Sequence, residues 1–139
     1  MILGVGTDIV QVDRFKSWQN YSKKQFLQIF SENELNDCAG GKELNLECLA
    51  SRFAAKESFF KALSASLVKL NLTENEFSFM FACQNVEMIK PVWGVPQLKI
   101  DWKVFEQKVG NQLPNLQVDL SISHEKSFAI SFVVISKIS

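Results

Sequence analysis

The sequence has few of the residues that build disulfide-linked or metal-held scaffolds. Of its 139 residues, three are cysteine, one is histidine and three are proline. Cys38, Cys48 and Cys83 are an odd number of cysteines without C-x-x-C spacing, which argues against a disulfide framework and against a zinc site. The sequence therefore predicts reduced thiols, as expected in a cytoplasm.

The chain also lacks an excess of either charge and any long apolar run. Fifteen basic residues balance fifteen acidic ones, so the composition does not favour nucleic acid or an anionic membrane as a partner. No apolar run approaches the roughly 20 residues that span a bilayer. The first ten residues lack a basic start and contain Asp8, so they do not read as a signal peptide. We expect a soluble, cytoplasmic protein whose charged partners meet local patches.

What the chain does contain is enough apolar material for a core. The apolar fraction is 47%, and twelve residues are phenylalanine, which is typical of a globular protein and argues against disorder. The length suits one domain with a core of its own. We therefore predict a single domain that spans residues 1–139.

The hydrophobic periodicity predicts strand, helices, then mostly strands. Ser31 and Glu34 have capping-box spacing and should open a short helix. The other predicted helices cover residues 12–29 (in two segments broken near 20–22), about 43–65 and 102–109. The predicted strands cover residues 2–8, 76–84, 86–89, 96–100, 116–123 and 128–135. This order indicates an α+β domain with an antiparallel sheet packed against the long central helix.

One acidic residue in the long helix stands out. At about 100° per residue, an apolar arc forms along this helix, and Glu57 falls inside it, about 40° from Phe53. The residues of the arc are Leu46, Leu49, Ala50, Phe53 and Phe60. A carboxylate on an apolar face is costly without a cation beside it. The ordinary interpretation is an internal ion pair with Lys61 at i,i+4; the alternative is a site that holds a cation with Glu57 and an anion with Arg52, Lys56 and Lys61.

Two other polar residues occupy unusual positions. Asp8 lies where the first strand is predicted to stop, after Gly4 and Gly6, which allow close approach of another backbone or a ligand. His124, the only histidine, lies in the turn of the last predicted hairpin. An ordinary cap or turn role would explain each of them.

The residue types nevertheless suit phosphoryl chemistry. Two carboxylates and little else suit Mg²⁺ better than zinc, and Arg52, Lys56 and Lys61 suit phosphate groups. Phosphate together with Mg²⁺ indicates phosphoryl transfer, in which charge neutralisation and positioning carry most of the catalysis. Spacing alone does not show that these residues meet in space.

A basic surface is predicted on the first helical segments. Its residues are Arg14, Lys16, Lys23 and Lys24, interleaved with Trp18 and Tyr21. The ordinary interpretation is a solvated helix face; the alternative is a docking surface for an acidic protein.

Three motifs in one order resemble a known family. Gly4-Val-Gly-Thr-Asp8-Ile-Val, followed by Arg14, resembles the opening motif of the holo-acyl-carrier-protein synthases, the small 4′-phosphopantetheinyl transferases of the bacterial fatty-acid type. Arg52-Phe-Ala-Ala-Lys-Glu57-Ser-Phe-Phe-Lys61-Ala-Leu resembles their central helix signature. Leu120-Ser-Ile-Ser-His124-Glu, followed by Phe128-Ala-Ile-Ser-Phe-Val, is similar to their C-terminal hairpin, and Gly94-Val-Pro96 to a weaker block.

The resemblance implies roles for individual residues. Asp8 and Glu57 would be the Mg²⁺ ligands, and with Lys61 and His124 they would form the catalytic set. Coenzyme A would lie between the central helix and a neighbouring subunit. The residues near it would be Arg52, Lys56, Lys61 and His124, with His124 in binding or in proton handling.

The resemblance also implies the reaction and the partners. A serine hydroxyl of an apo acyl carrier protein would attack the β-phosphorus of coenzyme A, and 3′,5′-ADP would leave, with Glu57 as a candidate base. The family is usually trimeric, with each active site shared across a subunit boundary. Because carrier proteins are acidic, the basic surface around Arg14, Lys16, Lys23 and Lys24 fits their docking; Arg14 matches a family position.

The chain departs from the family pattern after the central helix signature. Where a Gly-Thr-Gly-type turn is usual, it has Ser64-Ala65-Ser66, which lack the access of glycine to positive φ. Either the helix continues or the loop near coenzyme A takes another path. Two further functions therefore stay open: a non-catalytic relative that binds coenzyme A or a carrier protein, and a Mg²⁺-dependent hydrolase of small phosphate compounds.

Overall fold

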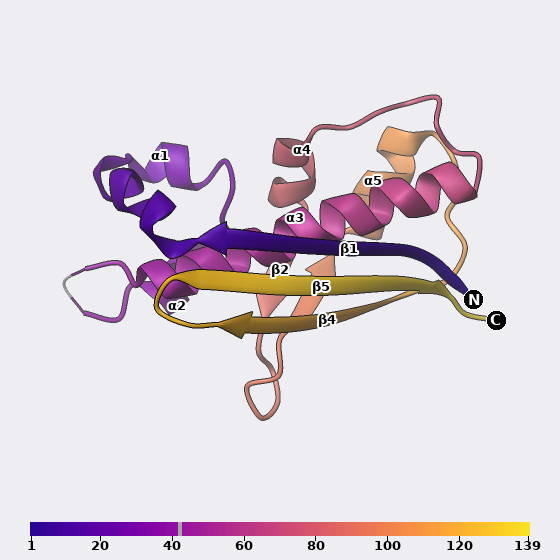
Figure 1. Cartoon of the computed structure of the whole chain (residues 1–139). Coiled ribbons are helices and arrows are strands. Elements are labelled where there is room, and N and C mark those ends of the chain that lie inside the picture. Colours follow the sequence, from indigo (N-terminus) through magenta and orange to yellow (C-terminus); the bar gives the residue numbers. More distant parts are fainter. Residues whose placement is uncertain (42) are drawn as a thin grey trace.

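A computed structural model describes residues 1–41 and 43–139 and shows an antiparallel sheet against one long helix (Figure 1). The sheet has the strand order β1-β5-β4, and β2 and β3 form a separate antiparallel pair. The elements are β1 (Ile2–Gln11), the 3₁₀ helix η1 (Val12–Asn20), α1 (Lys23–Phe26), α2 (Glu32–Cys38), α3 (Leu46–Lys69), α4 (Phe79–Gln84), β2 (Val86–Ile89), β3 (Gln97–Ile100), α5 (Trp102–Val109), β4 (Leu116–His124) and β5 (Phe128–Lys137). The α+β fold class, with its antiparallel sheet and long helix, is confirmed.

The first and last strands are neighbours in the sheet. β1 pairs along its length with β5, so that Asp8 lies opposite Ser131. The hairpin of β4 and β5 places His124 opposite Ala129. As a result the two chain ends lie side by side (Figure 1), and the Met1 amino group donates a hydrogen bond to the Lys137 carbonyl at 3.1 Å.

Two glycines allow β1 to lie directly on α3. A Cβ atom on Gly4 would come within 2.0 Å of the Ala62 carbonyl oxygen, and one on Gly6 within 1.9 Å of the Ser58 carbonyl oxygen. Real Cβ atoms do not approach so closely, so only glycine permits this contact between the two backbones. The close approach expected from Gly4 and Gly6 is therefore an approach to the helix backbone.

Helix α3 is the axis of the core. Its N-terminal half packs on η1 and α2 with buried residues such as Phe15, Phe30 and Phe53, and its C-terminal half packs on α5 and the sheet with Phe59 and Phe105. Burying apolar surface on two sides of one helix is the main source of stability in a small domain. In the part of the chain that the structure describes, no helix is both long enough and apolar enough to cross a membrane.

Two predicted elements differ from the structure. Residues 76–84 were expected to form a strand, yet residues 79–84 form helix α4, whose N-cap Ser78 accepts a hydrogen bond from the Phe81 backbone N–H. The Phe-rich composition favoured a strand, but Phe77 and Phe81 each pack against Phe105 of α5, so tertiary contact overrides local propensity. Helix α3 also runs on to Lys69 instead of ending near residue 65.

The prediction of three reduced cysteines is wrong. Cys38, at the end of α2, and Cys48, in the first turn of α3, form a disulfide with a Cα–Cα distance of 5.4 Å, which is within the usual range. The Asn45 backbone N–H donates to the Cys38 carbonyl at 2.8 Å, so the end of α2 lies beside the start of α3, which a spacing of ten residues does not reveal. Cys83 is a free, buried thiol, and burial raises its pKa to about 12.

Candidate active site

Asp8 and Lys61 meet where β1 crosses α3. The Lys61 ammonium donates a hydrogen bond to the Thr7 carbonyl at 3.0 Å and lies 3.3 Å from Asp8 Oδ1. The Asp8 side chain is only 14% exposed, whereas that of Lys61 is 50% exposed. Asp8 therefore faces the helix, and Lys61 reaches over it toward solvent.

Glu57 belongs to the same group of charges. Burial first, and then the negative charge of Asp8, raise the pKa of the Glu57 carboxyl, while Lys61 and Arg14 lower it. Burial likewise raises the pKa of Asp8 against the opposing effect of Lys61. Among the described residues Glu57 has no ion-pair partner within 4.0 Å, so the internal ion pair between Glu57 and Lys61 does not form.

The two carboxyl groups suit a hard divalent cation. Asp8 Oδ2 is buried and has no hydrogen-bond partner among the residues that the structure describes, which leaves one oxygen available to a ligand and costly to leave alone. Carboxylate oxygens are what Mg²⁺ prefers, and a cation between Asp8 and Glu57 would offset both their burial and their repulsion. No group of three or more His, Cys, Asp or Glu side chains forms a metal site in residues 1–41 and 43–139, so such an ion would keep several waters.

A second polar site lies near the other end of α3. A cavity of about 400 Å³ is lined by Ser51, Arg52, Lys90 and His124, among others. Within residues 1–41 and 43–139, Ser51 Oγ and Arg52 Nε are buried without hydrogen-bond partners, although Arg52 also lies 3.5 Å from Asp37 and donates to the Cys48 carbonyl. Two unused polar atoms beside three basic side chains suit a phosphate-bearing ligand.

His124 has a partner at the edge of this cavity. Its Nδ1 lies 3.4 Å from Oε2 of Glu47, in the first turn of α3, and both side chains are partly exposed. Glu47 therefore lies beside Nδ1, and Nε2 is the ring nitrogen that this carboxylate does not contact.

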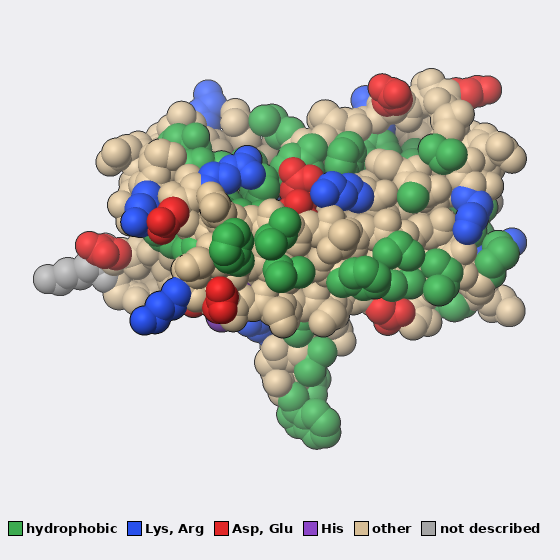
Figure 2. Space-filling model, viewed as in Figure 1, with side chains coloured by type: hydrophobic (Ala, Val, Ile, Leu, Met, Phe, Trp, Pro, Cys, Tyr) green, Lys and Arg blue, Asp and Glu red, His purple; other side chains and the backbone are tan. Residues whose placement is uncertain are grey.

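The two groups of residues do not meet within one chain. Arg52 and Glu57 are five residues apart on α3, which turns their side chains about 140° from each other. Asp8, Glu57 and Lys61 do not line the cavity that holds Arg52 and His124. On the face shown in Figure 2, acidic side chains lie between basic ones near the middle of the molecule. The structure thus brings Asp8, Glu57 and Lys61 together, and separately Arg52 and His124.

Comparison with known proteins identifies the family. Residues 4–133 match the sequence profile of the 4′-phosphopantetheinyl transferase superfamily. A holo-[acyl-carrier-protein] synthase of Ehrlichia canis is 32% identical over 138 residues, which cover 97% of this chain and 94% of the relative. One from Halothermothrix orenii is 34% identical over 135 residues, covering 96% and 97%. The chain belongs to the holo-[acyl-carrier-protein] synthase family.

The fold agrees with this family. The crystal structure of a holo-(acyl-carrier-protein) synthase from Bacillus anthracis in complex with CoA (3′,5′-ADP) superposes with a TM-score of 0.68 at 29% identity, covering 99% of both chains. In this member of the family, Ser64-Ala65-Ser66 lie inside α3. Of the two alternatives for this segment, the structure shows the first: the helix continues where the family usually has a glycine-containing turn.

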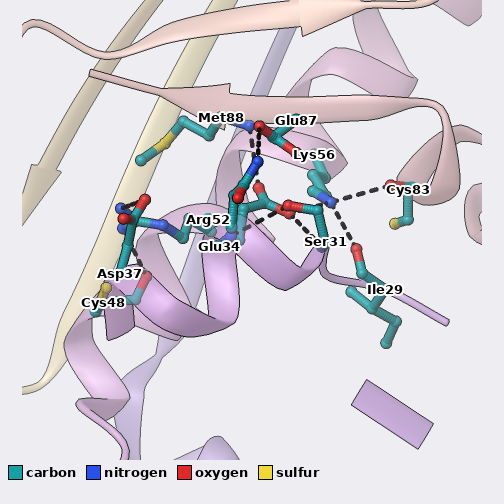
Figure 3. Close-up of polar contacts among 11 residues, drawn as sticks. Ile29, Ser31, Glu34, Asp37, Cys48, Arg52, Lys56, Cys83, Glu87 and Met88 are labelled. Carbon is teal, nitrogen blue, oxygen red and sulfur yellow. Dashed lines mark hydrogen bonds and ion pairs between the residues drawn. The ribbon is translucent and has the colours of Figure 1, made fainter. Parts of the chain in front are cut away.

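One residue that the family resemblance placed near coenzyme A has another role here. Lys56 is fully buried, and its ammonium contacts Glu34 at 2.6 Å, the Ile29 carbonyl at 2.6 Å and the Cys83 carbonyl at 3.0 Å (Figure 3). Glu34, also fully buried, accepts hydrogen bonds from the backbone N–H groups of Ser31 and Met88. The assignment of Lys56 to coenzyme A phosphates is corrected, because all three of its donors point into the protein.

Two of the four cations on the basic surface are paired with a carboxylate. Arg14, Lys16, Lys23 and Lys24 are all exposed. Lys16 pairs with Asp13 at 3.2 Å, and Lys23 pairs with Glu32 at 3.1 Å. The Arg14 guanidinium lies 5.0 Å from the Phe53 ring centre, and within the described chain Lys24 has no ion-pair partner within 4.0 Å. Arg14 and Lys24 therefore carry the available positive charge.

Three residues of these sites were not predicted from the sequence. Lys90 and Ser51 line the Arg52 cavity, and Glu47 contacts His124. An exposed lysine before a proline and a serine inside a helix carry no local signal. The only sequence feature that marks Glu47 is its position in the first turn of a helix. An acidic residue there is ordinarily explained by its favourable interaction with the helix dipole.

The Lys56–Glu34 pair leads to a stability prediction. Lys56→Met leaves a buried carboxyl without its cation, so the free energy of unfolding should fall by about 3–5 kcal/mol. Lys61→Met, which removes a half-exposed ammonium, should cost about 0–1 kcal/mol. Urea unfolding of both variants measures the difference. A Lys56→Met protein of normal stability that no longer binds coenzyme A would contradict the structural role.

Proposed function

We propose that this enzyme transfers the 4′-phosphopantetheine group of coenzyme A to a serine of an apo acyl carrier protein, with Mg²⁺, and releases 3′,5′-ADP. The observation that carries the proposal is the partly buried pair Asp8 and Glu57 beside Lys61. The family supports the same reaction, since the curated relatives are named for it. The complex of the Bacillus anthracis protein supports coenzyme A as the donor.

The reaction exchanges one phosphate ester bond for another. The serine oxygen forms a bond to the β-phosphorus, the bond from that phosphorus to the bridging pyrophosphate oxygen breaks, and the serine proton leaves to a base. Bound Mg²⁺ would neutralise pyrophosphate charge at this step. Glu57 is the candidate base, because its raised pKa makes it a better proton acceptor than an ordinary carboxylate.

The basic side chains have separate tasks in this proposal. Lys61, half exposed above Asp8, is suited to a phosphate oxygen of the pyrophosphate. Arg52, Lys90 and His124 line the second cavity and suit the phosphates of the departing nucleotide. We assign His124 to the binding of this nucleotide, with Glu47 holding its ring.

A shared active site follows from the separation of the two groups. One chain presents Asp8, Glu57 and Lys61 on one side of α3 and the Arg52 cavity on another, so we infer that a single coenzyme A contacts these two groups from adjacent subunits. The outer face of β1 and β5 supports this, because it exposes apolar side chains that a monomer would rarely leave in water. They are Val5, Ile9, Ile130 and Phe132, and Figure 2 shows hydrophobic side chains along this sheet. We infer a homotrimer, as is usual in the family.

We further infer that the acidic carrier protein docks on the surface of η1 and α1. Arg14 and Lys24 are the exposed cations there without a compensating carboxylate, and Arg14 is close enough to Asp8 and Glu57 to lower the pKa of both. A carrier bound at Arg14 would therefore present its serine beside the carboxylate pair.

The first prediction concerns Glu57→Gln and transfer. Mass spectrometry of the carrier should show the phosphopantetheine increment with the wild-type enzyme, coenzyme A and Mg²⁺, and at least a hundredfold slower transfer with Glu57→Gln, because general base and metal ligand are both lost. Glu74→Gln, in an exposed loop, is the matched control. Binding of both substrates without an increment would instead indicate a non-catalytic relative, and loss of coenzyme A without a modified carrier would indicate a hydrolase.

The same variant should not lose stability. A carboxyl whose folded pKa is raised binds its proton more tightly in the folded state, so its contribution to stability falls as pH rises from the ordinary pKa through the raised one. At pH 7 the charged Glu57 is therefore unfavourable, and Glu57→Gln should melt at the same temperature or higher. Mg²⁺ should raise the melting temperature of the wild-type protein and not that of the variant.

The second prediction concerns the trimer. Phe132→Asp places a charge on the exposed apolar face of β5, so light scattering after gel filtration should show monomers and the transfer assay should show no activity. Met80→Asp, which charges an exposed hydrophobic residue on α4, is the control and should stay trimeric.

Mixed subunits test whether the site is shared. Glu57→Gln and His124→Ala chains, each inactive alone, should regain part of the wild-type activity when refolded together, because one interface then combines an intact Glu57 with an intact His124. Activity of the Phe132→Asp monomer, or no recovery in the mixed trimers, would contradict the shared site.

The third prediction concerns docking. Lys24→Glu should raise the KM for the carrier several-fold at low salt and leave the KM for coenzyme A unchanged, because a surface charge acts mainly on the association of its own partner. Lys103→Glu, an exposed position on α5, is the matched control. Equal changes in both KM values would count against this surface.

A further inference from the structure

The disulfide between Cys38 and Cys48 forms part of the wall of the Arg52 cavity. Cys38 is the last residue of α2 and Cys48 lies in the first turn of α3, so the bond joins the two helices. Cys48 lines the cavity, and so does Asp37, which directly precedes Cys38. The state of this bond therefore bears on the shape of the cavity.

Both polar partners of Arg52 adjoin the disulfide. The Arg52 guanidinium donates a hydrogen bond to the Cys48 carbonyl at 3.4 Å and lies 3.5 Å from Asp37 Oδ2 (Figure 3). The Arg52 side chain is only 6% exposed, and among the described residues it has no other ion pair within 4.0 Å. The orientation of Arg52 thus depends on the end of α2 and the start of α3 staying together.

The partner of His124 adjoins the disulfide as well. Glu47, which directly precedes Cys48, lies 3.4 Å from Nδ1 of His124. Arg52 and His124 are the two residues to which the proposed function gives the nucleotide phosphates together with Lys90. Both of them are therefore contacted by a cysteine of this bond or by the neighbour of one.

The start of α2 is anchored independently of the disulfide. Glu34, in the first turn of α2, is fully buried and contacts the Lys56 ammonium of α3 at 2.6 Å. This ion pair lies one turn before Cys38. Opening of the disulfide is therefore expected to loosen the last turn of α2, which carries Asp37, and to leave the rest of the fold in place.

One sulfur of the disulfide is open to exchange. Cys38 is fully buried, whereas Cys48 is partly exposed and lines the cavity. Cys83 does not compete, because burial raises the pKa of its thiol to about 12 and a thiol rather than a thiolate is a poor nucleophile. A thiolate from solution is thus directed to the sulfur of Cys48, with Cys38 as the leaving group.

We propose that the Cys38–Cys48 disulfide positions Arg52 and His124 for the nucleotide phosphates of coenzyme A, and that its reduction lowers the affinity of the enzyme for this nucleotide. The inference rests on the proposed function, which puts the nucleotide in the Arg52 cavity. With the bond closed, Asp37 and Glu47 hold the two basic side chains before the ligand arrives. With the bond open, the ligand has to order them, which weakens binding.

The switch is a thiol–disulfide exchange with a small thiol. Its thiolate attacks Sγ of Cys48, the bond between the two protein sulfurs breaks, and Cys38 leaves as a thiolate that takes up a proton. A second small thiolate then attacks the small-molecule sulfur of the mixed disulfide and releases Cys48. Two small thiols are oxidised to one disulfide, and the protein disulfide is reduced to two thiols.

Calorimetric titration with 3′,5′-ADP, which contains no thiol, measures the switch without the transfer reaction. Oxidised wild-type protein should bind 3′,5′-ADP about tenfold more tightly than protein reduced with dithiothreitol, as expected from the cost of ordering one or two side chains. The double variant Cys38→Ala/Cys48→Ala should bind as weakly as reduced wild type with or without dithiothreitol. Cys83→Ala, which removes the other cysteine, is the matched control and should respond like wild type.

The nucleotide should in turn protect the disulfide, because coupling between two equilibria is reciprocal. A tenfold difference in affinity should lower the reduction potential of the disulfide by about 30 mV at saturating 3′,5′-ADP. Graded ratios of oxidised and reduced dithiothreitol set the potential, and alkylation followed by mass spectrometry gives the reduced fraction. Far-UV circular dichroism should show the same helix content in both states, because Lys56 and Glu34 stay paired.

Four results would overturn the switch: no disulfide in oxidising buffer, no binding of 3′,5′-ADP, equal or tighter binding after reduction, and an unfolded reduced protein. The last of these would make the bond purely structural. None of them decides whether phosphopantetheine is transferred, which the carrier assay tests by itself. A tenfold loss of 3′,5′-ADP affinity on reduction, with no transfer in the carrier assay, overturns the proposed function and keeps the switch as control of a nucleotide site.

Where transfer occurs, the switch should act on binding and not on the chemical step. The double variant Cys38→Ala/Cys48→Ala should have a KM for coenzyme A about tenfold above that of the oxidised wild type and a kcat within about threefold of it. The reason is that Asp8, Glu57 and Lys61 do not line the Arg52 cavity. An unchanged KM in this variant also overturns the switch.

Discussion

The contact between the backbones of β1 and α3 is the constraint on which the rest of the structure depends. Gly4 and Gly6 carry no side chain where the helix carbonyls of Ala62 and Ser58 approach, so the strand lies directly on the helix. Asp8 follows on the same strand and comes level with Glu57 and Lys61. A bulkier strand would stand further from the helix, and the two carboxyl groups would then each face water separately.

This contact concentrates negative charge at a cost to the fold. Burial raises the pKa of both carboxyls, and each is opposed by Lys61 and Arg14. The buried, unpartnered oxygen of Asp8 shows that the protein alone does not satisfy the site. A site that is unfavourable without a ligand favours the binding of one, because a bound cation would offset the burial and repulsion of the two carboxyl groups.

The same helix separates residues that are close in sequence. Arg52, Lys56 and Glu57 belong to one motif, yet they lie in three different surroundings: the cavity that His124 also lines, the buried network with Glu34, and the carboxylate pair. Lys56 thereby ties α3 to the loop before α2, to α4 and to α2 itself. A rigid helix that is anchored in this way keeps the Arg52 cavity and the carboxylate pair at a set separation.

The sequence by itself determined the fold class, the caps and the hairpin, because periodicity and capping residues are local signals. That Asp8, Glu57 and Lys61 share one site was implied only by the resemblance of their motifs to a family. The tertiary structure decided what depends on packing between distant segments. Residues 79–84 became a helix against Phe105, Cys38 met Cys48, and Lys56 turned inward because Glu34, 22 positions earlier in the chain, is buried beside it.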